Sequence, residues 1–178
     1  MPRMSAADFA PYLQHPITGV IASLRQDGAP YTVPVWWLWR PTDPPATGEF
    51  GYPAGELWIT GTYSRVWCKQ LLKDGRASLC IESSAEPYTA HVEFDGACTA
   101  FQRPEFDIWP ISRLLAEKYV GRDDPANAAA VDAFFSNMQT EPRLLFRLQP
   151  ATTRAIDMRV YRGKREDRAF QAGGKPAG

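Results

Sequence analysis

The chain of 178 residues is long enough for one sizeable hydrophobic core, and its composition does not require two domains. Its 20 basic and 20 acidic residues balance, so no overall charge would attract nucleic acid or an anionic membrane surface. No stretch is apolar for the length that a secretion signal or a membrane span needs. We therefore expect a single domain over residues 1–178, a cytoplasmic location, and neither nucleic acid nor membrane as a partner.

The three cysteines, Cys68, Cys80 and Cys98, are odd in number and lack CxxC spacing. This pattern argues against a disulfide framework and against a zinc site, so we expect buried, unreactive thiols and no bound metal. Aromatic residues make up 12% of the chain. A large area of flat ring surface must therefore be buried.

The first third of the chain predicts a helix and then antiparallel strands. The segment "SAADFAPYLQ" predicts a leading helix within residues 1–14, capped by Ser5. The runs "ITGVIASL" and "YTVPVWWLW" are typical of strands, and the Asp27-Gly28 pair between them is typical of a hairpin turn. Residues 40–55 are rich in Pro and Gly, which predicts a long surface loop.

The middle of the chain alternates strands with one helix. "ELWITG" predicts a strand, "SRVWCKQLLKD" a helix ended by Gly75, and "RASLCIES" a further strand. Residues 88–101 alternate well enough for a longer strand, with a bend or bulge at Asp95-Gly96.

Two helices and two strands are predicted for the remainder. Helical spacing relates Ile111, Leu114, Leu115 and Tyr119, and Asp124-Pro125 begins a second helix that would bury Val131, Phe134, Phe135 and Met138. "RLLFRLQ" predicts a strand, and "TRAIDM" a weaker one. The polar, Gly-rich residues 162–178 predict a flexible tail.

These elements amount to six or seven strands, mostly with short connections, and three or four helices. The absence of steady strand–helix alternation argues against a doubly wound parallel sheet. We expect a mainly β, α+β fold, with helices on the outside of an antiparallel barrel.

Basic residues recur along the helix predicted after Ser64. Arg65, Lys69 and Lys73 stand four residues apart and so share one face, while Val66, Leu71 and Leu72 supply apolar contacts elsewhere. On this pattern alone, a solvated helix face with an ordinary serine cap is the better explanation, because exposed basic residues are common.

The same segment also suits a phosphate group. Ser64 stands at the expected N-cap, and Thr60, Gly61 and Thr62 offer hydroxyl groups and a backbone that a ligand can approach closely. A helix N-terminus contributes only about 0.3–1 kcal/mol toward an anion. Cations and hydroxyl donors would have to complete such a site, and Ser64, Arg65 and Lys69 have the right chemistry and spacing for it.

The segment "TVPVWWLW" is apolar on both faces of the predicted strand. Side chains alternate along a strand, so Val35, Trp37 and Trp39 face one way, and Pro34, Trp36 and Leu38 face the other. One face belongs in the core, and a packed helix, a second subunit or a flat ligand would cover the other. Pro34 also removes a backbone donor from the strand.

The order of these segments resembles the flavin-binding split-barrel family, the pyridoxamine 5'-phosphate oxidase-like proteins. The resemblance covers about residues 15–158. It depends on "DGAPYTVPVWWLW", "LWITGTYSRVWCKQLLKDGRASLCI", "PYTAHVEFDGACTAF" and "RLLFRLQPATTRAIDM". It implies a homodimer of split antiparallel β-barrels, with flavin mononucleotide (FMN) at each side of the subunit interface.

The resemblance also implies a set of cofactor-binding residues. Residues 34–37 would run beside the isoalloxazine ring, and residues 59–62 with Ser64 and Arg65 would reach the ribityl phosphate. Where the oxidases begin the helix with a Ser-Arg-Lys run, this chain has Val66 and Trp67, so Lys69 would take over the phosphate contact. The full set is Pro34, Val35, Trp36, Trp37, Ile59, Thr60, Gly61, Thr62, Ser64, Arg65 and Lys69.

The resemblance predicts an FMN-dependent oxidoreductase acting on a small-molecule substrate or electron donor. No arginine and histidine pair near the C-terminus resembles the oxidases' vitamin-binding residues, so oxidation of pyridoxamine phosphate itself is not expected. No triad, paired carboxylates or metal-ligand cluster identifies a catalytic residue. The alternatives are a deazaflavin cofactor, haem, for which only His15 and His91 are available as axial ligands, or a non-catalytic flavin-binding module.

Overall fold

The structure is a computed structural model that describes residues 2–85 and 87–161. Within them the chain forms seven strands, four α-helices and four shorter helical turns. The strands are β1 (Gly19–Leu24), β2 (Pro30–Val35), β3 (Leu38–Pro41), β4 (Gly55–Thr62), β5 (Arg76–Ser83), β6 (Ala90–Phe101) and β7 (Arg143–Asp157). The helices are α1 (Ala6–Gln14), α2 (Val66–Lys73), α3 (Trp109–Ala116) and α4 (Ala128–Met138). The turns are η1 (Glu49–Gly51), η2 (Glu117–Gly121), η3 (Pro125–Asn127) and η4 (Arg159–Tyr161).

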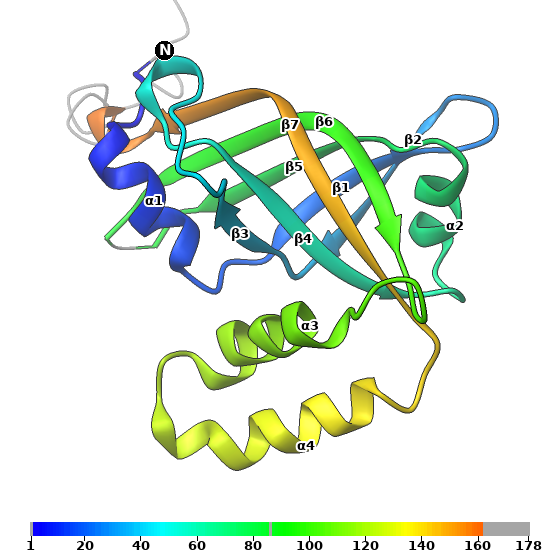
Figure 1. The fold of residues 1–178 in the computed structure, drawn as a ribbon. Coiled ribbons are helices and arrows are strands. Elements are labelled where there is room, and N and C mark those ends of the chain that lie inside the picture. The colour runs from blue at the N-terminus through cyan, green and yellow to red at the C-terminus, as the bar shows by residue number, and fades with distance from the viewer. Residues whose placement is uncertain (1, 86, 162–178) are drawn as a thin grey trace, which may run out of the picture.

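All seven strands join one antiparallel sheet in the order β2-β1-β5-β6-β7-β4-β3. The sheet curls strongly but does not close, because β2 and β3 form its two edges and do not pair with each other (Figure 1). These two edge strands are nevertheless neighbours in sequence. Trp36 and Trp37 alone carry the chain from one edge of the sheet to the other. The expected mainly β, α+β split barrel is therefore confirmed.

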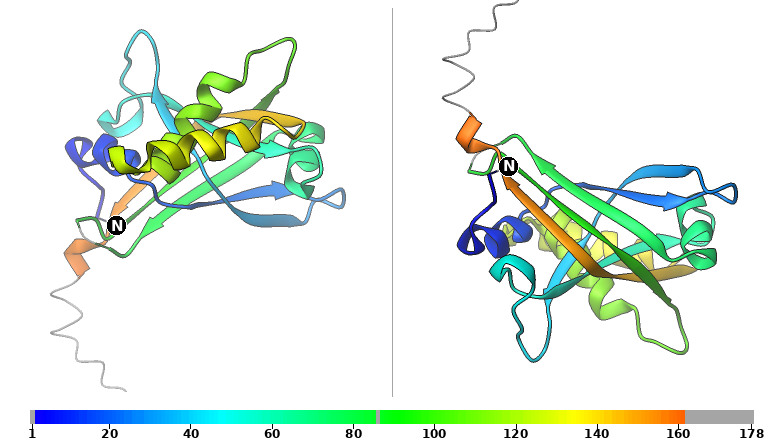
Figure 2. Two further views of the ribbon diagram at one scale, coloured as in Figure 1. Left: turned by 90° about the horizontal axis from the view of Figure 1, so that it is seen from below. Right: turned by 90° about the horizontal axis from the view of Figure 1, so that it is seen from above.

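The helices occupy three places around the sheet. Helices α1 and α2 lie at opposite ends of it, while α3 and α4 form a hairpin across one outer side (Figures 1 and 2). Helix α1 places Phe9, Tyr12 and Leu13 in the core inside the sheet, and α2 adds Trp67, Cys68 and Leu71. Helix α3 packs instead on Trp58 and Leu145 of the outer face, and α4 packs against α3. The sequence between β6 and β7 thus supplies a cover for one side of the barrel.

Local sequence signals are confirmed where they act over a few residues. Ser5 caps α1 by accepting a hydrogen bond from the Asp8 amide, and Gly28 adopts a positive φ of 83° in the β1–β2 hairpin. The register of β6 against β7 shifts between Asp95 and Gly96, as a bulge requires.

Several expectations are wrong in detail. The run at 31–39 forms two strands, β2 and β3, rather than one. Asp124 and Pro125 begin the short turn η3, α4 begins only at Ala128, and Phe134 and Phe135 are half-buried rather than buried. Residues 143–157 form one strand, because β7 continues past Pro150 where two strands were expected. Helix α2 begins after Arg65, so Ser64 is not its N-cap. Val66 and Leu72 are exposed rather than packed. Of the three thiols only Cys68 is buried, since Cys80 is exposed and Cys98 is half-buried. The predicted tail at 162–178 lies outside the described residues.

Candidate functional site

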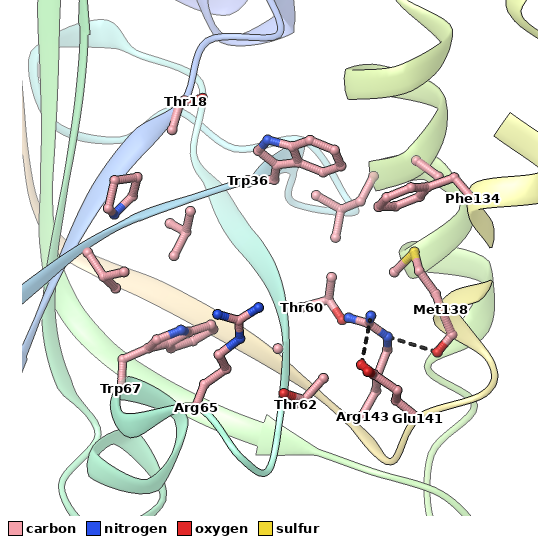
Figure 3. Close-up of a pocket in the computed structure, with 16 residues that line it drawn as sticks. Thr18, Trp36, Thr60, Thr62, Arg65, Trp67, Phe134, Met138, Glu141 and Arg143 are labelled. Atoms are coloured by element: carbon pink, nitrogen blue, oxygen red, sulfur yellow. Dashed lines mark hydrogen bonds and ion pairs between the residues drawn. The ribbon is translucent and has the colours of Figure 1, made fainter. Parts of the chain in front are cut away.

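A cavity of about 380 Å³ lies between the split in the sheet and the α3–α4 hairpin (Figure 3). Its walls come from the end of β2, the end of β4, the turn that leads into α2, the two helices of the hairpin and the start of β7. The volume falls within the range of small-molecule sites. The lining residues are Thr18, Val33, Pro34, Val35, Trp36, Thr60, Gly61, Thr62, Arg65, Trp67, Leu115, Ala116, Phe134, Met138, Glu141 and Arg143.

Two arginines lie at one end of this cavity. Arg65 stands directly before α2 and Arg143 begins β7, and the pairing of β4 with β7 sets Thr62 opposite Arg143. Both guanidinium groups point into the cavity in Figure 3. Among the described residues no carboxylate forms an ion pair with Arg65. The two cations therefore form a positive end to the cavity.

Arg143 is held in place by its own neighbourhood. Its Nε donates to the Met138 carbonyl oxygen at 2.8 Å, and its terminal nitrogen lies 3.6 Å from the exposed Glu141 carboxylate. Burial, with a contribution from Arg65, lowers the pKa of Arg143 from its usual value, against the opposing charge of Glu141. A guanidinium in this position lacks full hydration, and an anion between the two arginines would offset that cost.

Hydroxyl groups and backbone amides lie next to the arginines. The side-chain oxygens of Thr62 and Ser64 are 2.8 Å apart and hydrogen-bonded, and the Arg65 amide donates to the Thr62 carbonyl oxygen. This tight turn leads into α2, whose N-cap, Arg65, makes no side-chain capping bond. The first amides of α2 are left for other acceptors, and the helix dipole adds to the positive end.

Gly61 allows α2 to approach β4 closely. A Cβ built at Gly61 would collide with Cys68 Sγ and would come within 2.6 Å of the Trp67 ring. Burial raises the pKa of the Cys68 thiol to about 12, which outweighs the opposite effect of Arg65 and Arg143. Cys68 is therefore a packed, protonated thiol at neutral pH, and the glycine fixes where α2 begins.

The opposite end of the cavity is aromatic and apolar. The indole ring of Trp36 stacks on Tyr119 at 4.7 Å between ring centroids and 3° between planes, and lies 5.4 Å from Phe134. Leu115 and Met138 extend this surface. A helix hairpin of the same chain thus covers the second face of residues 33–39, which removes the reason that this segment gave for expecting a second subunit there.

The structure brings together seven of the predicted site residues. Lining the cavity are Pro34, Val35, Trp36, Thr60, Gly61, Thr62 and Arg65. The side chains of Trp37 and Ile59 are fully buried in the core instead, and Lys69 is exposed on α2. Ser64 reaches the site through Thr62.

Sequence reasoning missed Arg143, Phe134, Met138 and Glu141. Arg143 is the first residue of a predicted strand, which was a usable signal, but only the register of β7 on β4 places it opposite Thr62. The two histidines do not line the cavity, since His15 packs near Tyr88 and His91 lies 3.7 Å from Glu93. The cavity therefore offers no axial histidine for haem.

The described lining residues include one carboxylate, Glu141, and no histidine, cysteine, lysine or tyrosine. A side chain that exchanges a proton near neutral pH is thus missing from this wall of the cavity. The arrangement can bind an elongated ligand with an anionic group at one end and a flat apolar group at the other.

No family model and no curated protein matches the sequence. Solved structures do match: a conserved hypothetical protein from Mycobacterium tuberculosis is 23% identical, with a TM-score of 0.61, over 98% of this chain and 95% of that chain. An F420 reductase is 20% identical, with a TM-score of 0.51, over 79% and 91% of the two chains. A putative pyridoxamine 5'-phosphate oxidase from Listeria innocua is 13% identical, with a TM-score of 0.51, over 84% and 96%.

The chain has the split-barrel fold of the pyridoxamine 5'-phosphate oxidase-like proteins. At these identities the likeness establishes the fold alone. In the described part of the split barrel, no helix has both the length and the apolar character needed to cross a membrane.

Proposed function

We propose that this split-barrel protein binds a flavin-type cofactor, FMN, in the cavity between β2, β4 and the α3–α4 hairpin, and acts as an oxidoreductase on a small molecule. One observation carries the proposal. Arg65 and Arg143 point into the positive end of a cavity whose other end is formed by the aromatic rings of Trp36 and Phe134. This polarity matches a cofactor that joins a phosphate to a flat ring system.

Each part of the cavity has a role in this proposal. Arg65 and Arg143 would bind the phosphate, with hydroxyl groups of Thr62 and Ser64 and the first amides of α2 as further donors. Pro34, Val35 and Trp36 would lie along the ring. When bound, the flavin would supply the hydride or electron transfer, and the protein would orient it and exclude water. Any proton would come from solvent or from the substrate.

A deazaflavin is the second candidate, and the basic face of α2 favours it. Lys69 is exposed one turn beyond Arg65, with Lys73 a further turn along. This row would suit the anionic tail of a deazaflavin better than the single phosphate of FMN. The similarity to an F420 reductase agrees with this alternative.

The absorbance spectrum of the purified protein, with mass analysis of any released cofactor, tests the proposal directly. Titration of cofactor-free protein with FMN and with F420 then separates the two candidates, and Lys69→Gln combined with Lys73→Gln should weaken F420 binding alone. Turnover with reduced nicotinamide and common acceptors distinguishes an enzyme from a non-catalytic flavin-binding module. A colourless protein that binds neither compound would refute the proposal.

Homodimer assembly, which the resemblance implies, and a cytoplasmic location, which the lack of an apolar signal segment suggested, both remain predictions. The molar mass in solution checks the first, because the chain itself has a mass of 19.9 kDa. A monomer would show that the cavity of one chain must hold the cofactor without a second subunit.

A further inference from the structure

Tyr119 contacts the two residues, Trp36 and Trp37, at which the chain crosses the split in the sheet. Trp36 and Trp37 lie between β2 and β3, so the Trp37 amide has no partner in the sheet ladder. It donates instead to the Tyr119 hydroxyl at 3.2 Å, and that hydroxyl donates to the Ile17 carbonyl oxygen at 2.9 Å. The Trp37 indole Nε1 donates to the same carbonyl at 2.8 Å. The phenol thus bridges the crossing and the segment before β1.

The ring of Tyr119 acts on the neighbouring residue, Trp36. The two rings are stacked almost parallel, and Trp36 forms the aromatic wall of the cavity. Tyr119 is itself buried, which raises the pKa of its hydroxyl above the usual value. The hydroxyl therefore keeps its proton at neutral pH and can donate to Ile17 while accepting from Trp37.

Lys118, the residue before Tyr119, contacts the same crossing. Its Nζ donates to the Leu13 carbonyl oxygen at 2.9 Å, at the end of α1, and lies 3.4 Å from the centroid of the Trp37 ring. Both residues belong to η2, a π-type turn directly after α3. One turn of the α3–α4 hairpin therefore contacts both tryptophans of the crossing.

We propose that Tyr119 is a positioning residue for the cavity: its hydroxyl fixes the backbone at Trp37, and its ring fixes the indole of Trp36 as the wall against which the cofactor lies. Only the contact of the cofactor with Trp36 rests on the proposed function. The placement of the Trp37 backbone and of the Trp36 ring does not, so the two claims can fail separately.

Tyr119→Phe is the decisive variant, because it keeps the ring and removes the hydroxyl. The Trp37 amide then loses its acceptor, and a buried amide without a partner drives a local rearrangement of the crossing. We expect the indole N–H resonance of Trp36, identified by its loss in Trp36→Phe, to shift in the NMR spectrum. We also expect the dissociation constant for FMN to rise by roughly fivefold or more.

Tyr12→Phe is the matched control. Tyr12 is also buried, and its hydroxyl donates to the carbonyl oxygens of Ile81 and Ala90, away from the cavity. Its removal should lower stability in a comparable way and leave both the Trp36 resonance and FMN affinity unchanged. A general loss of packing would affect the two variants alike.

The outcomes separate the two claims. An unmoved Trp36 resonance in Tyr119→Phe would overturn the positioning role whatever the cofactor affinity. A shifted resonance in a protein that binds neither FMN nor F420 would support that role and refute the proposed function instead. Deuterium exchange in the wild-type protein needs no variant: the Trp37 amide should exchange as slowly as amides in the sheet ladder, and rapid exchange would contradict the bridge.

Discussion

The guanidinium groups of Arg65 and Arg143 share one end of a cavity, and Arg65 contributes to lowering the pKa of Arg143. Two cations placed together disfavour each other, and among residues 2–85 and 87–161 the one carboxylate paired with them is the exposed Glu141. An anionic group between them would relieve this repulsion. On the proposed function, the pair would give the cavity a preference for a phosphate that neither residue would give alone.

Replacing either arginine should weaken the binding of FMN. A hydrogen bond to a charged group is worth about 1.5–3 kcal/mol, so Arg65→Gln and Arg143→Gln should each raise the dissociation constant by at least roughly tenfold. Fluorescence titration with FMN measures the effect. Titration with riboflavin, which has no phosphate, should give the same affinity in wild type and variants.

Lys69→Gln provides the control for this prediction. Lys69 lies on α2, the helix that begins directly after Arg65, but it is exposed and does not line the cavity. Its loss removes the same charge and should leave FMN affinity within about twofold, as expected for a screened surface cation. An equal loss of FMN and riboflavin binding in the arginine variants would instead indicate a damaged fold and would remove both residues from the phosphate site.

The strand face of the aromatic segment could be predicted because alternation is a local property. Val35, Trp37 and Trp39 do enter the core, while Trp36 and Leu38 pack on the hairpin side, even though the strand itself is interrupted. The pattern could not show which part of the protein packs on the second face of this segment. Tyr119, which is far away in sequence, supplies it through η2.

The phosphate end was only half predictable for the same reason. Arg65 follows directly from the strand–helix join, but Arg143 enters through the register between β4 and β7, which depends on long-range packing. The N-cap prediction failed because the Ser64 hydroxyl pairs with Thr62, which leaves Arg65 at the helix start. Short-range preferences were overridden where side chains compete for the same hydrogen bonds.

Gly61→Ala should destabilise the protein and weaken cofactor binding together. The added methyl group would meet Cys68 and Trp67 of α2, so the start of the helix must move away from β4. We expect urea unfolding to show a loss of about 1–3 kcal/mol, as is typical of overpacked sites. FMN affinity should fall as well, because Arg65 moves with α2.

Gly48→Ala, in the loop before β4, is the control for Gly61→Ala. There the new Cβ would find its nearest atom, the Tyr52 carbonyl oxygen, at 3.5 Å, which is ordinary contact. This variant should be close to wild type in stability and in FMN binding. A similarly small effect of Gly61→Ala would show that α2 is not held against β4 as described.

Lys118 should make stability depend on pH. Burial lowers the pKa of its amine from 10.5 to about 7, and among the described residues no carboxylate forms an ion pair with it. Between these two values the unfolded chain binds more protons than the folded one, so the free energy of unfolding from this group increases as pH rises from about 7 toward 10.5. The loss of stability that comes from burying the charged amine is therefore greatest below about pH 7 and absent above about pH 10.5.

Lys118→Met isolates this effect, because it keeps an unbranched side chain over the Trp37 ring and removes the charge. Urea unfolding of wild type and variant across pH 6–10 should show the variant gaining less stability with rising pH. The Trp37 ring face and the Leu13 carbonyl oxygen both favour the ammonium form, so the measured pKa should fall between 7 and 10.5. If stability changed with pH in parallel for the two proteins, the amine would be hydrated in the folded state and would not be packed against the Trp37 ring.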